Sequence, residues 1–513
     1  MYRKPSPQMT LDDFILPFAG GLSVDNRWVR LAKLIPWDEI EKEYAFLFPS
    51  DRGNVAKPVR MALGSLIIQA RCGYTDRELL AQIAENPYLQ YFIGLKEFQL
   101  TKPFTPVALV KFRKRFNQKR LTKVNELILA AESAEREAEE KRTAEKRSDD
   151  DDHTSGGNNG NNAADPETAG DAPTAEPANV KQQPNQGTLI LDSTCTPADI
   201  HYPTDIRLLN EAREKLDEMI DVVHEATGKV VKRPRTYREK ARKDYLSLSK
   251  QRKPRKDQIR KALRKQMQYA GRNLKIVETM LRNWGKAGGV NPLSNRHQEL
   301  LTTIKTVLEQ QQTMYKTRNH RVEDRIVNLY QPHVRPIVRG KAGTPVEFGA
   351  KVALSLENGY SRIEKLSWDP FNESGTLIES VENYKKRCGH YPEAVLADQI
   401  YRNRANLAYC KEHKIRLSGP RLGRAPAEAQ LQKVEKKIAR QDARARNAVE
   451  GKFGEGKRKY SLDRIFARLK ETAECVIAMQ FLVMNLEHKL RVLFVQIWNR
   501  LMWEENGALF EAS

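Results

Sequence analysis

A short apolar run over Thr188–Thr194 has the pattern of a buried central strand. Three apolar residues, 189–191, follow one another and the run ends at the carboxylate of Asp192. A continuous apolar stretch of this length, preceded by polar sequence, is typical of a strand covered on both faces. We therefore expect a strand that begins a domain and carries Asp192 at its end. The alternative is that Asp192 is an ordinary turn residue.

A second β-rich region follows much later in the chain. Val346–Glu357 and Tyr360–Trp368 are predicted strands, and Asn358–Gly359 between them is a strong hairpin signal because a type I′ turn needs positive φ at both central positions. After a helical pattern over 375–388, the apolar run Pro392–Asp398 predicts a strand that again ends at an aspartate.

The remaining pattern of this region alternates helix and strand. It predicts a helix at 402–413, a short strand at 415–418, a Gly/Pro loop at 419–426 and a long charged helix from Ala427 past Glu450. On that helix Val449 and Phe453 are four residues apart and share one face. Such a mixed α/β order can bring strand ends and one helical face together around a cleft.

The N-terminal 130 residues have helical patterns. One helix is predicted after Pro58, a second begins at the capping box of Thr75 and Glu78, and a third at Thr105–Pro106. The third helix is strongly basic, with Lys111, Arg113, Lys114 and Arg115. Short helices ending in a basic one suggest a helix-turn-helix type module that docks on DNA. A packing or dimerisation domain with a solvated basic face is the alternative.

Two stretches between these regions differ in composition. Residues 131–187 carry Ala/Glu/Lys repeats, an acidic run and then Gly/Asn/Pro/Ala-rich sequence, which predicts a disordered linker. Residues 201–345 have mainly helical patterns, and within them Gly228–Lys275 holds nineteen Lys or Arg against three acids. With tyrosines interleaved, this surplus favours contacts to a phosphate backbone. A solvated helical arm is the alternative.

The whole-chain composition agrees with a polyanionic partner. The 513 residues carry a net charge of +22, which favours nucleic acid over a small acidic substrate or a membrane surface. The longest apolar stretch, Cys475–Trp503, is interrupted by charged residues, so we expect a buried or partner-facing helix and no membrane span. No signal peptide is evident. Five scattered cysteines favour neither disulfides nor a zinc site, and a reducing cytoplasm fits them: Cys72, Cys195, Cys388, Cys410 and Cys475.

One acid lies on each of the first strand, the later strand and the long helix. If Asp192, Asp398 and Glu450 converge, their carboxylates repel one another unless a hard cation binds, and magnesium or manganese is the natural match. Two such ions about 4 Å apart can activate a nucleophile and stabilise the leaving oxygen of a phosphoryl displacement. The spacing of three acids is by itself a weak signal.

These acids and their neighbours resemble those of the transposases of bacterial insertion sequences. Those transposases belong to the DDE superfamily, which has a ribonuclease-H-like fold. The resembling segments are Leu191–Thr194, Leu396–Tyr401, Arg446-x3-Glu450-x6-Lys457 with Gly451–Gly454, Arg339–Gly343, Thr75–Leu79 and Tyr91–Leu95. They cover about Lys57 to Phe116 and Thr188 to Arg491. The tyrosine of the family's Y-x2-R-x3-E-x6-K signature would fall at Ala443, which puts that tyrosine's role in doubt.

The resemblance implies a division of the chain and a set of roles. The expected parts are a helical DNA-binding domain (1–130), a linker (131–187), the first strand of the catalytic core (188–200), a basic helical insertion (201–345), the rest of the core (346–470) and a C-terminal helix (471–513). Asp192, Asp398 and Glu450 would be catalytic and hold two Mg²⁺ or Mn²⁺ ions. Arg446 and Lys457 would contact phosphate.

The resemblance also implies an activity. The chain would bind terminal inverted repeats of its element, hydrolyse phosphodiesters there and join the freed 3′-hydroxyl to a target strand, as a homodimer or larger assembly on DNA in the bacterial cytoplasm, associated with the nucleoid. A catalytically silent, transposase-derived DNA-binding protein is the main alternative. A general nuclease is a third.

Overall fold

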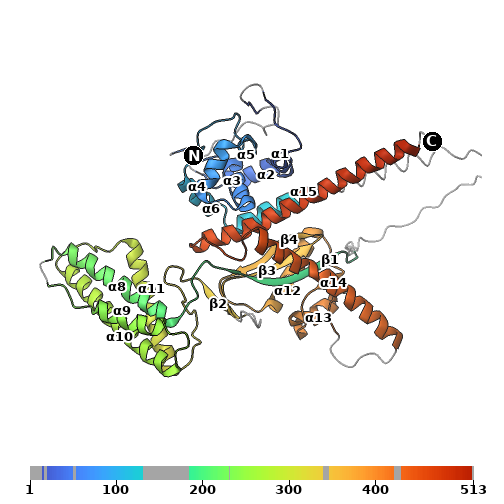
Figure 1. Cartoon of the computed structure of the whole chain (residues 1–513). Coiled ribbons are helices and arrows are strands. Elements are labelled where there is room, and N and C mark those ends of the chain that lie inside the picture. The colour runs from blue at the N-terminus through green and yellow to red at the C-terminus, as the bar shows by residue number, and fades with distance from the viewer. Residues whose placement is uncertain are drawn as a thin grey trace, which may run out of the picture.

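The computed structural model describes residues 14–16, 20–49, 54–130, 184–229, 232–338, 346–420 and 429–510. Figure 1 shows three groups of elements: the N-terminal helices, a sheet flanked by helices, and a helical arm that projects to one side. Most of the expected linker (131–183), the segment 339–345 before the hairpin and residues 421–426 of the Gly/Pro loop lie outside the described residues.

The N-terminal part is helical in the range described. Its elements are α1 (Arg27–Leu34), α2 (Trp37–Ala45), α3 (Val59–Cys72), α4 (Asp76–Glu85), α5 (Pro87–Phe92) and α6 (Pro106–Arg115), followed by helical residues 118–130. Their apolar faces meet in one core that includes Trp28, Leu63 and Phe92. The core is built by helices that are each too short to be stable alone.

The three helix starts expected in this part are confirmed. Helix α3 begins directly after Pro58, and α4 begins at a capping box in which Thr75 and Glu78 bond each other's backbone N–H groups. Helix α6 begins at Thr105–Pro106, but the Thr105 side chain makes no capping hydrogen bond. Proline at the first position therefore defines this start, since it supplies a helical φ and has no N–H to satisfy.

The sheet is mixed. Its described strands are β1 (Thr188–Pro197), β2 (Arg335–Val338), β3 (Val346–Glu357), β4 (Tyr360–Ser367), β5 (Ala394–Leu396) and β6 (Arg416–Leu417). They lie in the order β2-β3-β1-β5-β6, with β4 also paired to β3. Strands β2, β3 and β4 are antiparallel to their neighbours, whereas β5 and β6 run parallel to β1.

Strand β1 is central, as predicted, but it is longer than predicted. It continues past Asp192 because it keeps pairing with β3 as far as Pro197 and Gly349. The expected hairpin between β3 and β4 is confirmed, with φ of 50° at Asn358 and 83° at Gly359. Both central residues of the turn thus have the positive φ that a type I′ turn needs.

Helices cover both faces of the sheet (Figure 1). They are α12 (Leu377–Cys388), α13 (Arg404–Glu412) and α14 (Ala429–Lys459), with short 3₁₀ turns at Glu373–Thr376 and Gln399–Tyr401. Leu189 and Leu191 of β1 pack in a cluster with α12 and α13, whereas Ile190 packs against the larger core that includes α14. This alternation follows from the two-residue period of a strand.

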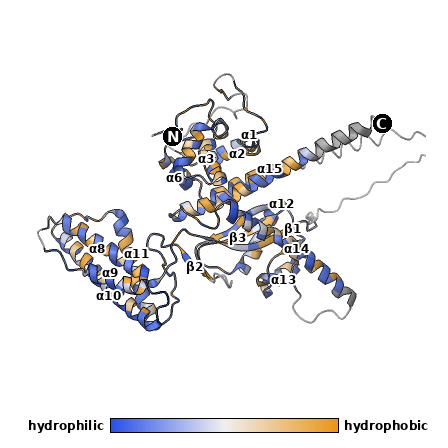
Figure 2. Ribbon diagram, viewed as in Figure 1, coloured by the Kyte–Doolittle hydropathy of each residue, from blue (hydrophilic) through white to orange (hydrophobic). Residues whose placement is uncertain are grey.

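The insertion after β1 forms the helical arm. Its elements are α8 (Asp205–Ala226), α9 (Arg238–Ser249), α10 (Lys256–Lys286) and α11 (Asn295–Thr317). The predicted apolar faces of α8, α10 and α11 meet in a separate core around Leu216, Val277 and Ile304. Figure 2 shows strongly hydrophilic stretches along the same helices. Strand β2 lies inside the range 201–345, so the sheet resumes before the expected end of the insertion.

Helix α15 (Lys470–Phe510) joins the N-terminal helices to the sheet. It packs against α3 and α6 on one side and against β4 on the other (Figure 1). Arg71 of α3 pairs with Glu487, and Asn485 bonds to Ser361 of β4 and to Asn125. Among the described residues no helix has the length and apolar content to cross a membrane. All five cysteines are free thiols.

Candidate active site

The first two acids follow the same paired position of two neighbouring parallel strands. Strands β1 and β5 are parallel, and their last paired residues are Ile190 and Leu396. Asp192 and Asp398 each lie two residues further on, and Asp398 keeps an extended backbone with φ −70° and ψ 162°. Because side chains alternate along a strand, both aspartates continue the face of Ile190 and Leu396. The parallel register therefore brings the two predicted acids side by side.

The long helix α14 supplies the third acid. It packs against both β1 and β5. Val449 is fully buried and Phe453 is 8% exposed, which confirms that they share the inward face. Glu450 lies beside this face and is exposed. The helix is continuous to Lys459, so Lys457 lies about two turns beyond Glu450 on the same side, where it is half-buried.

Arg446 lies among the three acids. Its Nη1 atom is 3.4 Å from Oδ1 of Asp398, and its Nη2 atom is 3.8 Å from Oε1 of Glu450, one helical turn away. Both carboxylate side chains are 59% exposed, so each pair contributes less than about 1 kcal/mol to stability. The same guanidinium also lowers the pKa of Asp192. The structure thus places Arg446 beside Asp398 and Glu450, and the charge of Arg446 also acts on Asp192.

Asp192 is electrostatically the most perturbed of the three. Burial raises the pKa of its carboxyl group from 3.8 to about 6. A hydrogen bond from the Ser193 N–H, 2.7 Å long, opposes the rise in pKa. The charges of Glu373 and Asp398 add to the rise, and Arg446 offsets part of it. At neutral pH the carboxyl group of Asp192 is therefore ionised, although burial disfavours its negative charge. A cation bound beside it would offset that unfavourable burial.

The donor set suits a hard divalent cation. Asp192, Asp398 and Glu450 offer carboxylate oxygens only, which magnesium and manganese prefer. As they stand, no three Asp, Glu, His or Cys side chains in the described part of the chain are arranged to hold a metal ion. The guanidinium of Arg446 instead lies between two of the acids.

Glu373 is a fourth acid near the site that the sequence did not indicate. Its charge raises the pKa of Asp192, ahead of that of Asp398. Lys351 on β3 pairs with Glu373 at 2.8 Å, so its negative charge is partly neutralised. Glu373 lies in a short 3₁₀ turn and follows no apolar run. The sequence around Glu373 therefore does not mark it as an acid at the end of a strand.

The four basic residues of α6 have different environments. Lys111 and Lys114 are exposed. Arg113 is 9% exposed, and it donates hydrogen bonds to Asp76 of α4 and to Gln69 of α3. Its guanidinium therefore ties α6 to the neighbouring helices, and the two lysines remain open to a partner.

Arg115, the last residue of α6, is half-buried against α2. It donates a hydrogen bond of 3.2 Å to the hydroxyl group of Tyr44, and its guanidinium lies over the ring of Phe48 at 4.8 Å. A cation held over an aromatic ring keeps part of its hydration and its outward N–H groups. Arg115 thus makes structural contacts with Tyr44 and Phe48, and its side chain remains partly exposed.

Two family models match parts of this chain. Residues 395–487 match a family described as "Transposase DDE domain", and this range includes Asp398, Arg446 and Glu450. Residues 20–115 match a family described as "Transposase domain (DUF772)", which includes α6. Asp192 and the helical arm lie outside both matches.

A protein of Rhizobium meliloti, described as "Uncharacterized protein ORF8 in nfe locus", is 30% identical to this chain over 87 residues. The aligned segment is 17% of this chain and 42% of that protein, so the chain spans less than half of this relative. No solved structure matched the chain. The chain is thus similar to transposase domains in two separate segments, one in the N-terminal helices and one that includes α14.

Proposed function

We propose that this chain cleaves phosphodiesters at the ends of its own mobile element and joins the freed 3′-hydroxyl to target DNA. The observation that supports this proposal is that Arg446 pairs with both Asp398 and Glu450, while its charge lowers the pKa of Asp192. The match of residues 395–487 to a transposase domain and the net charge of +22 support DNA as the substrate.

We further propose that the core is ribonuclease-H-like. Strand β1 is central, with antiparallel β3 and β4 on one side and parallel β5 and β6 on the other. One acid lies on the central strand, one after the neighbouring parallel strand and one on a helix packed against both. This strand order and placement of acids support the proposed fold family.

Asp192, Asp398 and Glu450 are the residues that would hold magnesium or manganese, as two ions. When bound, such cations supply the charge that activates an attacking hydroxyl and stabilises the leaving oxygen. Arg446 holds the acids together in the free protein, and its pairs are long and exposed enough to exchange for a phosphate group. Lys457 lies on the same side of α14 and would contact the same backbone.

We propose that Arg446, Glu450 and Lys457, which follow one another along an unbroken helix, take the last three positions of the signature Y-x2-R-x3-E-x6-K. Its tyrosine position is Ala443, an exposed residue on α14. No acid is lost by this departure. The proposed chemistry therefore needs no tyrosine at this position.

DNA outside the active site would be bound by two other surfaces. Lys111 and Lys114 on α6 are exposed and would contact the terminal inverted repeats. The helical arm, with its surplus of Lys and Arg, would hold flanking or target DNA. Joining two element ends requires two active sites, so a dimer or larger assembly on DNA is part of the proposal.

The test is cleavage of a linear duplex that carries one end of the element, with Mg²⁺ present. Asp192→Asn should lower the cleavage rate by at least about 100-fold, the size of effect seen when a principal electrostatic group of an active site is lost. Asp463→Asn, in an exposed turn outside the proposed DNA-binding surfaces, is the matched control and should cleave normally.

Three results would contradict the proposal in different ways. Normal cleavage by Asp192→Asn would exclude the three-acid mechanism. Binding of the end without any cleavage by the unmodified protein would favour a catalytically silent DNA-binding protein. Cleavage at unrelated sequences with equal rate would favour a general nuclease.

A further inference from the structure

Two arginines of the helical arm lie over one tyrosine ring. The Cζ atoms of Arg235 and Arg272 are 4.5 Å and 4.6 Å from the centre of the Tyr237 ring. Arg235 precedes α9 and Arg272 lies on α10, so the ring gathers cations from two elements. Attraction to the ring holds each guanidinium, although the two repel each other.

Neither of these two guanidiniums has an acidic partner in the part of the chain that the structure describes. Within the described residues, Arg235 and Arg272 form no ion pair or hydrogen bond, and both side chains are exposed. The arginines beside Arg235 in sequence are different: Arg233 and Arg238 pair with Asp221 at 2.5 Å and 2.7 Å. The N–H groups of Arg235 and Arg272 thus remain available to a ligand outside the protein.

The backbone of Tyr237 is strained. Its φ of 56° and ψ of 33° lie in the left-handed region, which costs a tyrosine about 1 kcal/mol or more. Its ring is also partly exposed, so the strain does not serve to bury the side chain. A strained residue persists only where its surroundings hold it, and such residues gather at binding sites.

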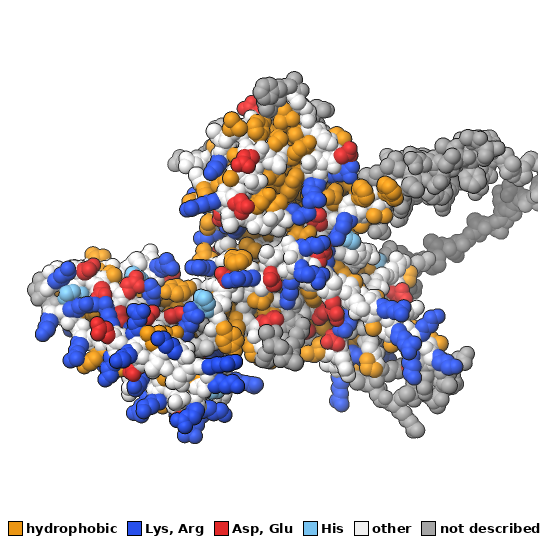
Figure 3. Space-filling model, viewed as in Figure 1, with side chains coloured by type: hydrophobic (Ala, Val, Ile, Leu, Met, Phe, Trp, Pro, Cys, Tyr) orange, Lys and Arg blue, Asp and Glu red, His pale blue; other side chains and the backbone are white. Residues whose placement is uncertain are grey.

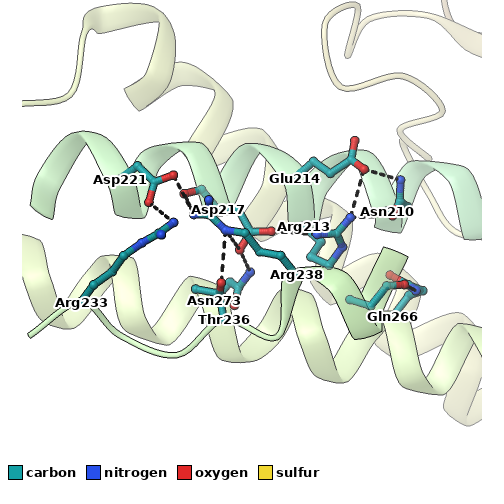
Figure 4. Close-up of polar contacts among 11 residues, drawn as sticks. Asn210, Arg213, Glu214, Asp217, Asp221, Arg233, Thr236, Arg238, Gln266 and Asn273 are labelled. Atoms are coloured by element: carbon teal, nitrogen blue, oxygen red, sulfur yellow. Dashed lines mark hydrogen bonds and ion pairs between the residues drawn. The ribbon is translucent and has the colours of Figure 1, made fainter. Parts of the chain in front are cut away.

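A buried polar network holds the backbone on both sides of this ring. Figure 4 shows Asp217 of α8 at its centre, accepting hydrogen bonds from Arg213 and Asn273 of 2.7 Å and 2.8 Å. Arg238 donates to the backbone carbonyl of Asp217 at 2.7 Å. Asn273 adjoins Arg272, and Arg238 adjoins Tyr237. The network therefore fixes both elements from which the ring and its two cations arise.

The surface around this ring is strongly positive. Figure 3 shows Lys and Arg side chains spread over the arm. Of the three acids within Gly228–Lys275, Asp244 pairs with Lys265 at 3.0 Å and Asp257 lies 3.7 Å from Arg255. The third acid, Glu239, is exposed in the first turn of α9. The guanidinium fork matches the oxygens of a phosphate group and binds them in pairs. A polyanion with regularly spaced phosphates is thus the complementary ligand.

We propose that Arg235, Tyr237 and Arg272 form a clamp for the phosphate backbone of duplex DNA. The buried network around Asp217 orders the clamp before DNA arrives, so little side-chain freedom is lost on binding. The clamp contacts backbone and reads no sequence. This inference rests on the proposed function, because it specifies where on the arm the DNA is bound.

The test measures binding of the full chain to a fluorescent duplex of arbitrary sequence, by anisotropy, over a range of KCl concentrations. Losing two phosphate contacts in the double variant Arg235→Ala/Arg272→Ala should reduce the slope of log affinity against log salt by about 2 and weaken binding about tenfold or more. The matched control, Arg282→Ala/Lys286→Ala, removes two exposed charges from α10 away from the ring. Equal losses in the two double variants would overturn the clamp.

Substitution of Tyr237 separates binding from folding. Tyr237→Gly removes the ring and relieves the left-handed strain, so its thermal stability should equal or exceed that of the unmodified protein while its affinity for duplex falls about three- to tenfold. Tyr237→Phe keeps the ring and should bind normally. Full affinity in Tyr237→Gly would overturn the clamp.

The same measurements distinguish failure of the clamp from failure of the proposed function. If the unmodified chain binds and cleaves element ends and the clamp variants bind equally well, only the clamp is wrong. If the unmodified chain binds no duplex, both proposals are wrong. If polyglutamate displaces the duplex from the unmodified chain at equal charge but not from the double variant, the clamp's ligand is an acidic polypeptide and the DNA assignment is wrong.

Discussion

Nη1 of Arg446 lies 3.4 Å from Oδ1 of Asp398, and this contact connects the long helix α14 to the end of β5. The same guanidinium is 3.8 Å from Glu450 and lowers the pKa of Asp192. One cation thus offsets repulsion among three carboxylates that come from separate parts of the chain.

Removing Arg446 should shift the pH dependence of end cleavage. Because Arg446 lowers the pKa of Asp192, Arg446→Gln should move the rising limb of the pH–rate profile to higher pH. Loss of its contact to phosphate should also reduce the rate about 10- to 100-fold at high pH. Arg446→Lys keeps the charge and should restore the position of the limb. An unmoved limb in Arg446→Gln would contradict the arrangement around Arg446.

Cleavage by the unmodified protein should rise with pH as Asp192 ionises. Its pKa of about 6 places the midpoint of that rise near pH 6 at low Mg²⁺. Since cation and proton compete for the same oxygens, more Mg²⁺ should move the midpoint to lower pH. Initial rates measured at several Mg²⁺ concentrations test both statements. A midpoint that does not respond to Mg²⁺ would show that Asp192 binds no cation.

Asp192→Asn should stabilise the fold at high pH. The folded pKa of about 6 lies above the ordinary value of 3.8, so the native state binds this proton more tightly than the unfolded state does. The associated stability is present below pH 3.8 and is lost as pH rises through about 6. A neutral amide avoids this loss, which amounts to at most about 3 kcal/mol. Urea unfolding should show the gain at pH about 8 but not near pH 4.

Arg113 and Lys114 are adjacent and should respond in opposite ways. Arg113→Ala removes the ion-pair partner of Asp76, which still accepts a hydrogen bond of 2.8 Å from Gln69, so the free energy of unfolding should fall by about 1–3 kcal/mol. Lys114→Ala removes an exposed charge and should change stability by less than about 0.5 kcal/mol. Only Lys114→Ala should weaken binding to an element end without loss of stability. Unfolding curves and anisotropy on both variants check the pair.

Gly349 allows close approach of β3 to β1. A Cβ atom added there would lie 2.1 Å from the backbone oxygen of Thr196, which a side chain cannot displace cheaply. Gly349→Ala should therefore lower the free energy of unfolding by about 3 kcal/mol and disturb the strand that carries Asp192. Gly375→Ala is the control, because nothing lies within 4 Å of its added Cβ. Equal stability of the two variants would contradict the observed register.

Much of the secondary structure could be predicted because the signals are local. Asn358–Gly359 requires only that two adjacent residues adopt positive φ, and both do. Thr75 and Glu78 satisfy each other's backbone, so the start of α4 is determined within four residues. The spacing of Val449 and Phe453 predicted which face of α14 is buried. These features depend on few distant contacts.

Pairing and charge environments could not be predicted in the same way. β1 extends to Pro197 because β3 offers partners that far, and sequence alone shows no partner. The basic residues of α6 look alike in the sequence. In the structure Arg113 is buried against Asp76, while Lys111 and Lys114 are exposed. Glu373 approaches Asp192 from a turn without any strand signal. Each case depends on an element far away in the chain.

By itself the sequence determined the strand and helix pattern, the three candidate acids and the excess of positive charge, because periodicity, turn chemistry and composition are properties of short segments. The tertiary structure alone decided that Asp192 and Asp398 follow the same paired position of the parallel strands β1 and β5. It also decided that Arg446 lies beside Asp398 and Glu450. It also decided that Arg235 and Arg272 meet over the ring of Tyr237. The reason is that electrostatic interactions depend on distance in space, and only folding fixes the distances between remote residues.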